Sequence, residues 1–277
     1  MTNLIRHTTD RHKPIVDAGN ALLDDVYFDL VHLEPGEENT VSVPGFELVL
    51  VVQSGACTIT CDDEVFRDVG RRTDIWSGKA DSVYAGTAET IRITAGGEGC
   101  ALAIAGGACP EPYAPFRVTP EEVESVVVGS PETKSKREIF HILGQNGNGR
   151  AGNLLVSELY AEDGCWSGYP PHKHDTARDG ETNHAELYHY RFNPPSGFGA
   201  QLHYDSQDAR AEIIRDGDTY LLPTGYHPTV TSPGHRAYVF TILVGRDQRG
   251  LVQYFDPDHA HLIDYIPGLA GMRDKFK

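Results

Sequence analysis

The sequence predicts an all-β protein that consists of two barrels. Short segments rich in Val, Ile, Tyr and Thr recur along the 277 residues, and Gly, Pro, Asn or Asp clusters separate them at spacings typical of a β-sandwich or barrel. No convincing long amphipathic helix interrupts them. The segments form two blocks of similar size, which we assign to residues 1–110 and 137–277, so a duplicated barrel is expected.

The first block contains many β-branched and aromatic residues, which pack well on a pleated surface. Its predicted strands are VYFDLVHL (26–33), FELVLVVQ (46–53), ACTITC (56–61), DSVYAG (81–86), ETIRITA (89–95) and ALAIA (101–105). The stretch that follows, about 107–136, begins with a Gly- and Pro-rich segment and is predicted to connect the two blocks. Within it, Thr119 is placed to cap a short helical turn.

The second block has the same strand character but a different chemistry. Its predicted strands are NLLVSELYA (153–161), AELYHYRF (185–192), GAQLHYDS (199–206), DTYLLP (218–223) and AYVFTILV (237–244). Ten of the thirteen histidines lie from residue 141 onward, whereas His32 is the only histidine in a predicted strand of the first block. We therefore expect an active site in the second block.

Composition narrows the class of function. The formal net charge of −16 argues against nucleic acid as a partner, because phosphate binding needs a basic face. The N-terminal residues lack the apolar run of a signal peptide, and no stretch approaches the roughly 18 apolar residues that span a bilayer. The five cysteines are scattered and odd in number, which argues against a disulfide framework. We expect a cytoplasmic protein that binds neither nucleic acid nor membrane.

Three short motifs in the second block carry candidate metal ligands. In SGYPPHKHD, His172 and His174 project to the same side of an extended segment, because side chains alternate along a strand. Glu186 supplies a carboxylate near the start of a β-prone segment, and His227 follows a Pro-Thr-Gly turn. Three imidazoles and one carboxylate suit a single catalytic divalent ion such as Zn, Mn or Fe.

These motifs resemble those of the cupin superfamily. The first cupin motif carries HxH followed by a Glu, and the second carries G…PxG…H, which Gly217, Pro223, Gly225 and His227 match. The resemblance implies a bicupin whose metal site lies in the C-terminal barrel. The N-terminal barrel lacks this set of ligands, so its expected roles are packing and subunit contact. Pairing of its edge strands with another barrel would favour a homo-oligomer.

Longer motifs point to one branch of that superfamily. WSGYPPHKHD, PPSGFGAQLHY, PTGYHPTVTSPG and DPDHAHL resemble the 5-deoxy-glucuronate isomerases of myo-inositol catabolism, and the resemblance covers most of residues 137–261. RTDIWSGKADSVYAG in the first block resembles the same family more weakly. This chain departs from the family pattern at His189, which interrupts a tyrosine triplet, and at His261, where Trp is usual.

The resemblance implies a metal-dependent aldose–ketose isomerase that converts 5-deoxy-glucuronate to 5-dehydro-2-deoxy-gluconate. The ion would act as a Lewis acid on the carbonyl and its neighbouring hydroxyl. Tyr188 shares strand parity with Glu186, and together with Gln201 it is our candidate for a catalytic contact. The candidates for substrate binding are Tyr190, His203, Tyr226 and Arg236. The partner of the substrate carboxylate stays open between Arg178 and Arg236.

Three other functions fit the same motifs. The nearest is a 5-keto-4-deoxyuronate isomerase of pectin degradation, although YPPHKHD without a cysteine favours the inositol branch. A cupin dioxygenase would use Fe and O₂ at the same ligands. A sugar-binding cupin without enzymatic activity would hold a ligand but not convert it.

Overall fold

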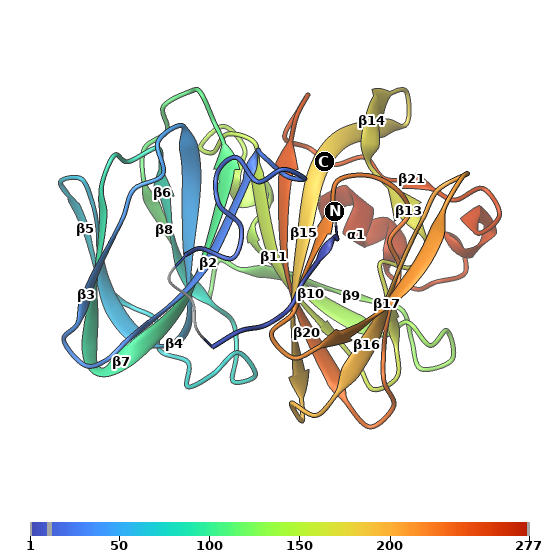
Figure 1. Cartoon of the computed structure of the whole chain (residues 1–277), viewed down its shortest axis with the longest axis horizontal. Coiled ribbons are helices and arrows are strands. Elements are labelled where there is room, and N and C mark those ends of the chain that lie inside the picture. The colour runs from blue at the N-terminus through green and yellow to red at the C-terminus, as the bar shows by residue number, and fades with distance from the viewer. Residues whose placement is uncertain (1, 10–12, 276–277) are drawn as a thin grey trace. The chain divides into compact units, whose positions relative to one another are not determined.

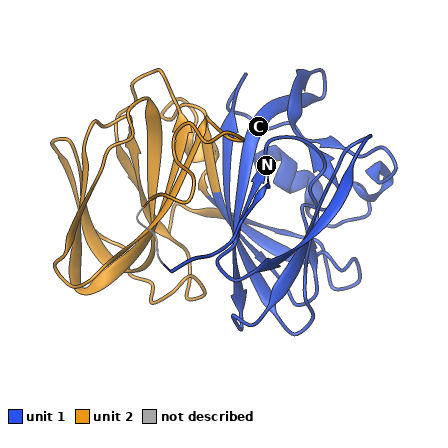
Figure 2. Cartoon of the chain, in the orientation of Figure 1, with its two compact units in different colours: residues 1–10, 125–141, 157–277 blue, residues 11–124, 142–156 orange. Residues whose placement is uncertain are grey.

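The computed structural model describes residues 2–9 and 13–275, and strands dominate it, as the sequence predicts (Figure 1). The one α-helix among these residues is short, α1 (Leu269–Lys275). The described residues fall into two compact units (Figure 2). What we call the first unit is orange and labelled unit 2 in Figure 2, and it comprises residues 13–124 and 142–156. What we call the second unit is blue and labelled unit 1, and it comprises residues 2–9, 125–141 and 157–275. No helix in the described part of the chain is long and apolar enough to cross a membrane.

The boundaries of these units differ from the predicted ranges of 1–110 and 137–277. The N-terminal residues belong to the second unit, because β1 (Leu4–Ile5) pairs with β18 (Thr219–Leu222). Part of the predicted connector is also a strand of that unit, β9 (Glu124–Val128). Such long-range pairings leave no local signal in the sequence, so a periodic pattern alone does not report them.

A seven-stranded sheet forms the first unit, with the strand order β2-β7-β4-β6-β8 and with β3 beside β7 and β5 beside β4. Its strands are β2 (Val26–Leu33), β3 (Glu38–Val41), β4 (Phe46–Cys61), β5 (Glu64–Val69), β6 (Asp81–Gly86), β7 (Ile91–Ala108) and β8 (Phe116–Val118). No helix follows Thr119, which instead closes a turn by accepting the Glu122 N–H at 3.0 Å.

Two of these strands are longer than predicted because a glycine bends each strand without ending it. The segments FELVLVVQ and ACTITC both belong to β4, and ETIRITA and ALAIA contribute to β7. Gly55 lies between the first two segments with φ of +73°, where the register with β7 shifts. A Cβ atom at Gly55 would lie 2.2 Å from the carbonyl oxygen of Gly99, so the two strands approach too closely there for any other residue.

One buried carboxylate explains why residues 142–156 lie with the first unit. Glu47 on β4 is fully buried, and its two oxygens accept the backbone N–H groups of Gly152, Asn153 and Leu154 at 2.5–2.9 Å. The hydroxyl of Tyr84 donates to the same carboxylate at 2.6 Å. These four hydrogen bonds satisfy a buried charge and attach the segment to the sheet.

The second unit contains an eight-stranded sheet of order β1-β18-β15-β20-β11-β10-β9, in which β14 also pairs with β15. A four-stranded sheet of order β12-β19-β16-β17 and the pair β13-β21 complete it. The remaining strands of these sheets are β10 (Arg137–Leu143), β11 (Leu154–Ala161), β12 (Trp166–Ser167), β13 (His172–Lys173), β14 (Asp175–Arg178), β15 (Glu181–Asn193), β16 (Phe198–Tyr204), β17 (Ala209–Arg215), β19 (Thr229–Thr231), β20 (Arg236–Gly245) and β21 (Tyr254–Phe255). The last residues of β10 and the first residues of β11 belong to the segment 142–156 of the first unit. All five cysteines of the chain are buried and free, as the sequence predicts.

Candidate metal centre

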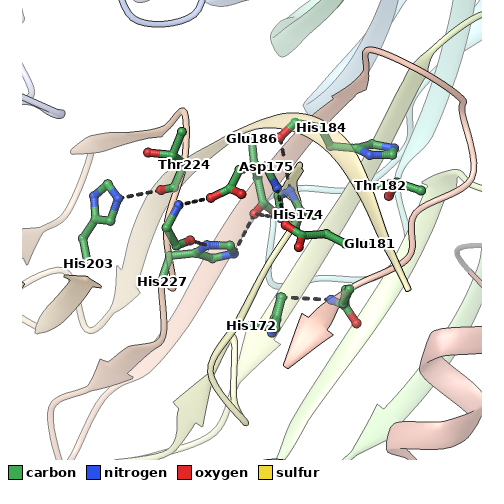
Figure 3. A network of polar contacts seen from close by, with 12 residues as sticks. His172, His174, Asp175, Glu181, Thr182, His184, Glu186, His203, Thr224 and His227 are labelled. Carbon is green, nitrogen blue, oxygen red and sulfur yellow. Dashed lines mark hydrogen bonds and ion pairs between the residues drawn. The ribbon is translucent and has the colours of Figure 1, made fainter. Parts of the chain in front are cut away.

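The second unit brings the four predicted metal ligands together in its interior (Figure 3). His172, His174 and His227 each offer a ring nitrogen, and these nitrogens lie within 4.8 Å of one another. The Oε2 atom of Glu186 lies 3.0 Å from Nε2 of His174 and 3.1 Å from Nε2 of His227. All four side chains are buried. Among the described residues, no other group of three such side chains is close enough to hold an ion.

Neighbouring strands fix the two histidines of the HxH motif. His172 lies in β13 and pairs with Phe255 of β21, while the His174 carbonyl accepts the N–H of His184 at 2.7 Å. Lys173 points away from the cluster, as strand parity predicts, and forms ion pairs with Asp175 and Glu181. The HxH segment is therefore held from both sides, and only the two imidazoles face the centre.

A glycine turn positions His227. Gly225 has φ of +85°, which favours glycine, and its N–H donates to Asp175 Oδ2 at 2.7 Å. A Cβ atom at Gly225 would lie 2.9 Å from Nε2 of His203, which packs beneath the turn. Asp175 follows His174 directly, so this one hydrogen bond joins the two motifs that supply the ligands.

Backbone carbonyls select the tautomer of all three histidines. The Nδ1 atoms of His172, His174 and His227 lie 3.1, 3.2 and 2.8 Å from the carbonyl oxygens of Pro170, His184 and Gly225. A carbonyl oxygen only accepts, so each Nδ1 carries the proton and each Nε2 of a neutral ring presents a lone pair. The Nε2 atom of His227 is buried and has no hydrogen-bond partner. Three lone pairs and one carboxylate form a donor set that a divalent cation fits.

The electrostatics of the cluster also favour a bound cation. Burial and the neighbouring His227 and His174 lower the pKa of His172 to about 3, so this ring is neutral. Burial alone would raise the pKa of Glu186, but the hydrogen bond with His174 and the adjacent His227 ring hold it below its ordinary value. Burial likewise opposes protonation of His174, yet the hydrogen bond and charge of Glu186 raise its pKa. An ionised carboxylate among buried imidazoles is an arrangement that a bound cation would stabilise.

A small cavity of about 50 Å³ lies beside the cluster and is lined by His172 and Glu186. Tyr188, a predicted catalytic residue, also lines it, and burial followed by the charge of Glu186 raises the pKa of this phenol well above its ordinary value. The predicted site residues did not include several polar residues of this lining, among them Gln253 and Arg137. Gln253 places its Nε2 atom 2.9 Å from Nε2 of His172, and Arg137 lies at the start of β10. Arg137 and the buried Ile139 are two residues apart on one strand, so their side chains lie on the same face of the sheet. This alternation is the sequence signal that could have identified Arg137 as a buried residue.

The other candidate residues lie outside this cavity lining. Gln201 is fully buried and uses its amide within the fold, accepting from the Tyr190 hydroxyl at 2.5 Å and donating to the His227 carbonyl at 2.9 Å. His203 contacts the Thr224 carbonyl at 2.6 Å. Tyr226 stacks on Tyr204, with ring centroids 5.1 Å apart.

Neither arginine considered for the substrate carboxylate lines the cavity. The side chain of Arg236 is 46 % exposed and lies 3.8 Å from Glu162. The side chain of Arg178 is similarly exposed and forms an ion pair with Glu181 at 2.6 Å. His189 faces away from Glu186 as predicted, and its Nδ1 atom contacts the Thr219 hydroxyl at 3.0 Å.

Comparisons with known proteins agree with this fold. Residues 3–262 match the model of the KduI/IolB family. A 5-deoxy-glucuronate isomerase of Shouchella clausii is 30% identical over 234 residues, which cover 83% of this chain and 84% of that protein. The 5-deoxy-glucuronate isomerase of Bacillus subtilis is 28% identical and covers 90% of this chain and 92% of its own length.

Two solved structures place the fold. An IolB-like protein of Salmonella typhimurium matches with a TM-score of 0.85 and 29% identity, over 94% of this chain and 98% of that chain. Bacillus subtilis oxalate decarboxylase, in an S161A mutant, matches with a TM-score of 0.59 and 14% identity, over 83% of this chain and 71% of that chain. The all-β architecture is therefore cupin-like.

Proposed function

Because the chain belongs to the KduI/IolB family and is an isomerase, we propose that it converts 5-deoxy-glucuronate to 5-dehydro-2-deoxy-gluconate in myo-inositol breakdown. The observation that supports this proposal best is the convergence of three buried histidines and Glu186 beside a cavity that Tyr188 also lines. An aldose–ketose isomerisation needs a site that stabilises negative charge on two neighbouring oxygens, and this donor set is suited to it.

The residues of the site divide the chemistry as follows. His172, His174, Glu186 and His227 would hold one divalent ion, Zn, Mn or Fe, which when bound polarises the carbonyl and the adjacent hydroxyl. Tyr188 stays protonated at neutral pH, so its hydroxyl donates a hydrogen bond to a substrate oxygen as charge develops there. The apolar part of the lining excludes bulk water from the enediol.

The organisation of the chain is a second part of the proposal. We propose a bicupin with barrels at about 1–110 and 137–277. The N-terminal residues would belong to the second barrel and residues 142–156 to the first, in line with the two compact units. The cupin-like relatives, and the fact that the described residues form one cluster able to hold a metal ion, support a structural N-terminal barrel and an active C-terminal one. Five free cysteines support a cytoplasmic location, and edge strands in the first barrel support a homo-oligomer.

The test is turnover by the purified, metal-analysed protein. Incubation with 5-deoxy-glucuronate should give 5-dehydro-2-deoxy-gluconate, which NMR detects as it forms. The reaction should consume no oxygen. Chelation or His172→Ala should reduce the rate by ~10³-fold or more, because the Lewis acid is lost. Turnover of 5-keto-4-deoxyuronate alone, or product formation that consumes O₂, would instead assign the alternative isomerase or a dioxygenase.

A further inference from the structure

Arg137 is a buried arginine whose surroundings lack an acid. Only 2% of its surface is exposed, and it begins β10 in the second unit. Its two terminal nitrogens donate to the carbonyls of Ser135 and Tyr169, both at 2.8 Å. These two hydrogen bonds hold the plane of the guanidinium in one orientation and leave its other N–H donors uncommitted.

A charge at this position is costly unless an anion meets it. Buried arginines are normally paired with carboxylates, because an isolated charge loses its hydration without compensation. Among the described residues, no Asp or Glu forms an ion pair with Arg137, and the groups that act on its pKa are Tyr188 and Cys165. Burial lowers that pKa to about 10, so the side chain still carries its charge at neutral pH.

Arg137 also shares the cavity beside the metal cluster. The same lining contains His172, Glu186 and Tyr188, and Arg137 is its one Lys or Arg side chain among the described residues. The lining also contains the carboxyl group of Glu186, so an anionic substrate is best accommodated with its own carboxylate on another wall, beside a cation. A guanidinium suits this role because its fork matches both oxygens of a carboxylate.

We propose that Arg137 is the carboxylate receptor of the active site, so that a sugar acid binds with its carbonyl end at the histidine cluster and its carboxylate on Arg137. This inference rests on the proposed function and adds a specificity residue to it. The Ser135 and Tyr169 carbonyls pre-orient the guanidinium, so little of its conformational freedom remains to be lost on binding. Neutral sugars of the same length would lack the partner that this buried charge requires.

Binding without turnover tests the assignment. The probe is the alditol acid obtained by reducing the aldehyde of 5-deoxy-glucuronate, compared with the amide of the same acid. Calorimetry on the metal-loaded full chain should show that Arg137→Met weakens the acid ~30-fold or more, because a bidentate charged contact is lost. Binding of the amide should change less than about threefold, and Arg137→Lys should weaken the acid by an intermediate amount.

Arg191→Met serves as the matched control, because the Arg191 side chain is 41% exposed, pairs with Asp216 and lies outside the cavity lining. It should leave both affinities unchanged. The assignment would be overturned if Arg137→Met lost equal affinity for the acid and the amide, or lost no affinity for the acid. If Arg137→Met does not fold, the same comparison is made with Arg137→Lys. The proposed function fails separately, if the wild-type chain binds the acid through Arg137 but does not isomerise the aldehyde.

Discussion

At the scale of single residues, the position of His227 depends on a side chain that does not line the cavity. The amide nitrogen of Gln201 donates to the backbone carbonyls of His227 and Pro228, and its oxygen accepts from Tyr190. Each end of the amide is therefore occupied within the protein. Gln201, a predicted catalytic residue, is placed to act through His227, a proposed metal ligand, and not on the substrate.

We predict that Gln201→Met weakens metal binding by ~10–100-fold, because the backbone of His227 loses its support. The rate constant kcat measured at saturating metal should stay within a few-fold of wild type. A chelator-competition titration and activity assays at increasing metal concentration provide the two values. Gln248→Met is the control, because Gln248 is exposed and donates only to the nearby Gly250 carbonyl. Unchanged metal affinity with a large loss of kcat would instead indicate that Gln201 contacts the substrate directly.

The sequence predicts the ligands better than the rest of the pocket for a geometric reason. Strand parity and a Pro-Thr-Gly turn are local features, and they identify His172, His174 and His227. The alternation of side chains along a strand tells which face of the sheet a residue lies on, but not how far along the strand it lies from the site. Arg236 lies on β20 seven residues before Leu243, the partner of Glu186, which corresponds to roughly 23 Å along a strand. Arg137 was missed because only the folded chain brings β10 to the cavity.

At the scale of elements, the short helix α1 closes one wall of the cavity. Leu269 and Met272 line it and belong to an apolar cluster with Ile139 and Phe255. The cavity volume of about 50 Å³ is enough for about one or two water molecules and too small for a sugar acid. A seven-residue helix held by apolar contacts opens more easily than the strands of the other walls, which are hydrogen-bonded along their length.

We predict that a bound sugar acid displaces this wall. Hydrogen exchange of the metal-loaded protein should show altered protection in residues 266–275 when the alditol acid is added. Peptides from β20, which also contributes Thr241 and Leu243 to the lining, should be unaffected because that strand is paired on both sides. Identical exchange of the C-terminal segment with and without ligand would show that the opening occurs elsewhere.

At the scale of the whole molecule, each unit depends on contacts that are distant in sequence. Residues 142–156 were expected within the second barrel, but Glu47 attaches the N–H groups of residues 152–154 to the first unit. A carboxylate at the second position of an apolar segment such as FELVLVVQ gives no sign of its partner 105 residues later. The pattern of strands was therefore predictable, whereas the assignment of this segment was not.

We predict that Glu47→Ala destabilises the first unit by about 3–5 kcal/mol, because it removes the buried acceptor of three backbone N–H groups and of the Tyr84 hydroxyl. Glu47→Gln should cost less, because the amide oxygen still accepts. Denaturant unfolding of both variants measures the difference. Glu34→Ala is the control, because Glu34 is an exposed residue in the loop after β2. A loss below about 1 kcal/mol for Glu47→Ala would mean that water replaces the carboxylate.

Alkaline pH acts on the molecule as a whole through its buried phenols. Burial, with the Asp29 charge, raises the pKa of Tyr27 to about 12, and burial, with Glu212, raises that of Tyr220 to about 12. A pKa raised in the folded state means that the folded state disfavours the phenolate. The stabilising contribution is therefore complete below pH ~10 and is lost as pH rises towards 12. The net charge of −16 at pH 7 becomes more negative over the same range and adds repulsion.

We predict that the free energy of unfolding of wild type falls by roughly 1 kcal/mol more than that of Tyr27→Phe between pH 8 and pH 11. Urea unfolding at each pH measures it. Equal losses would show that Tyr27 ionises without opposing the fold.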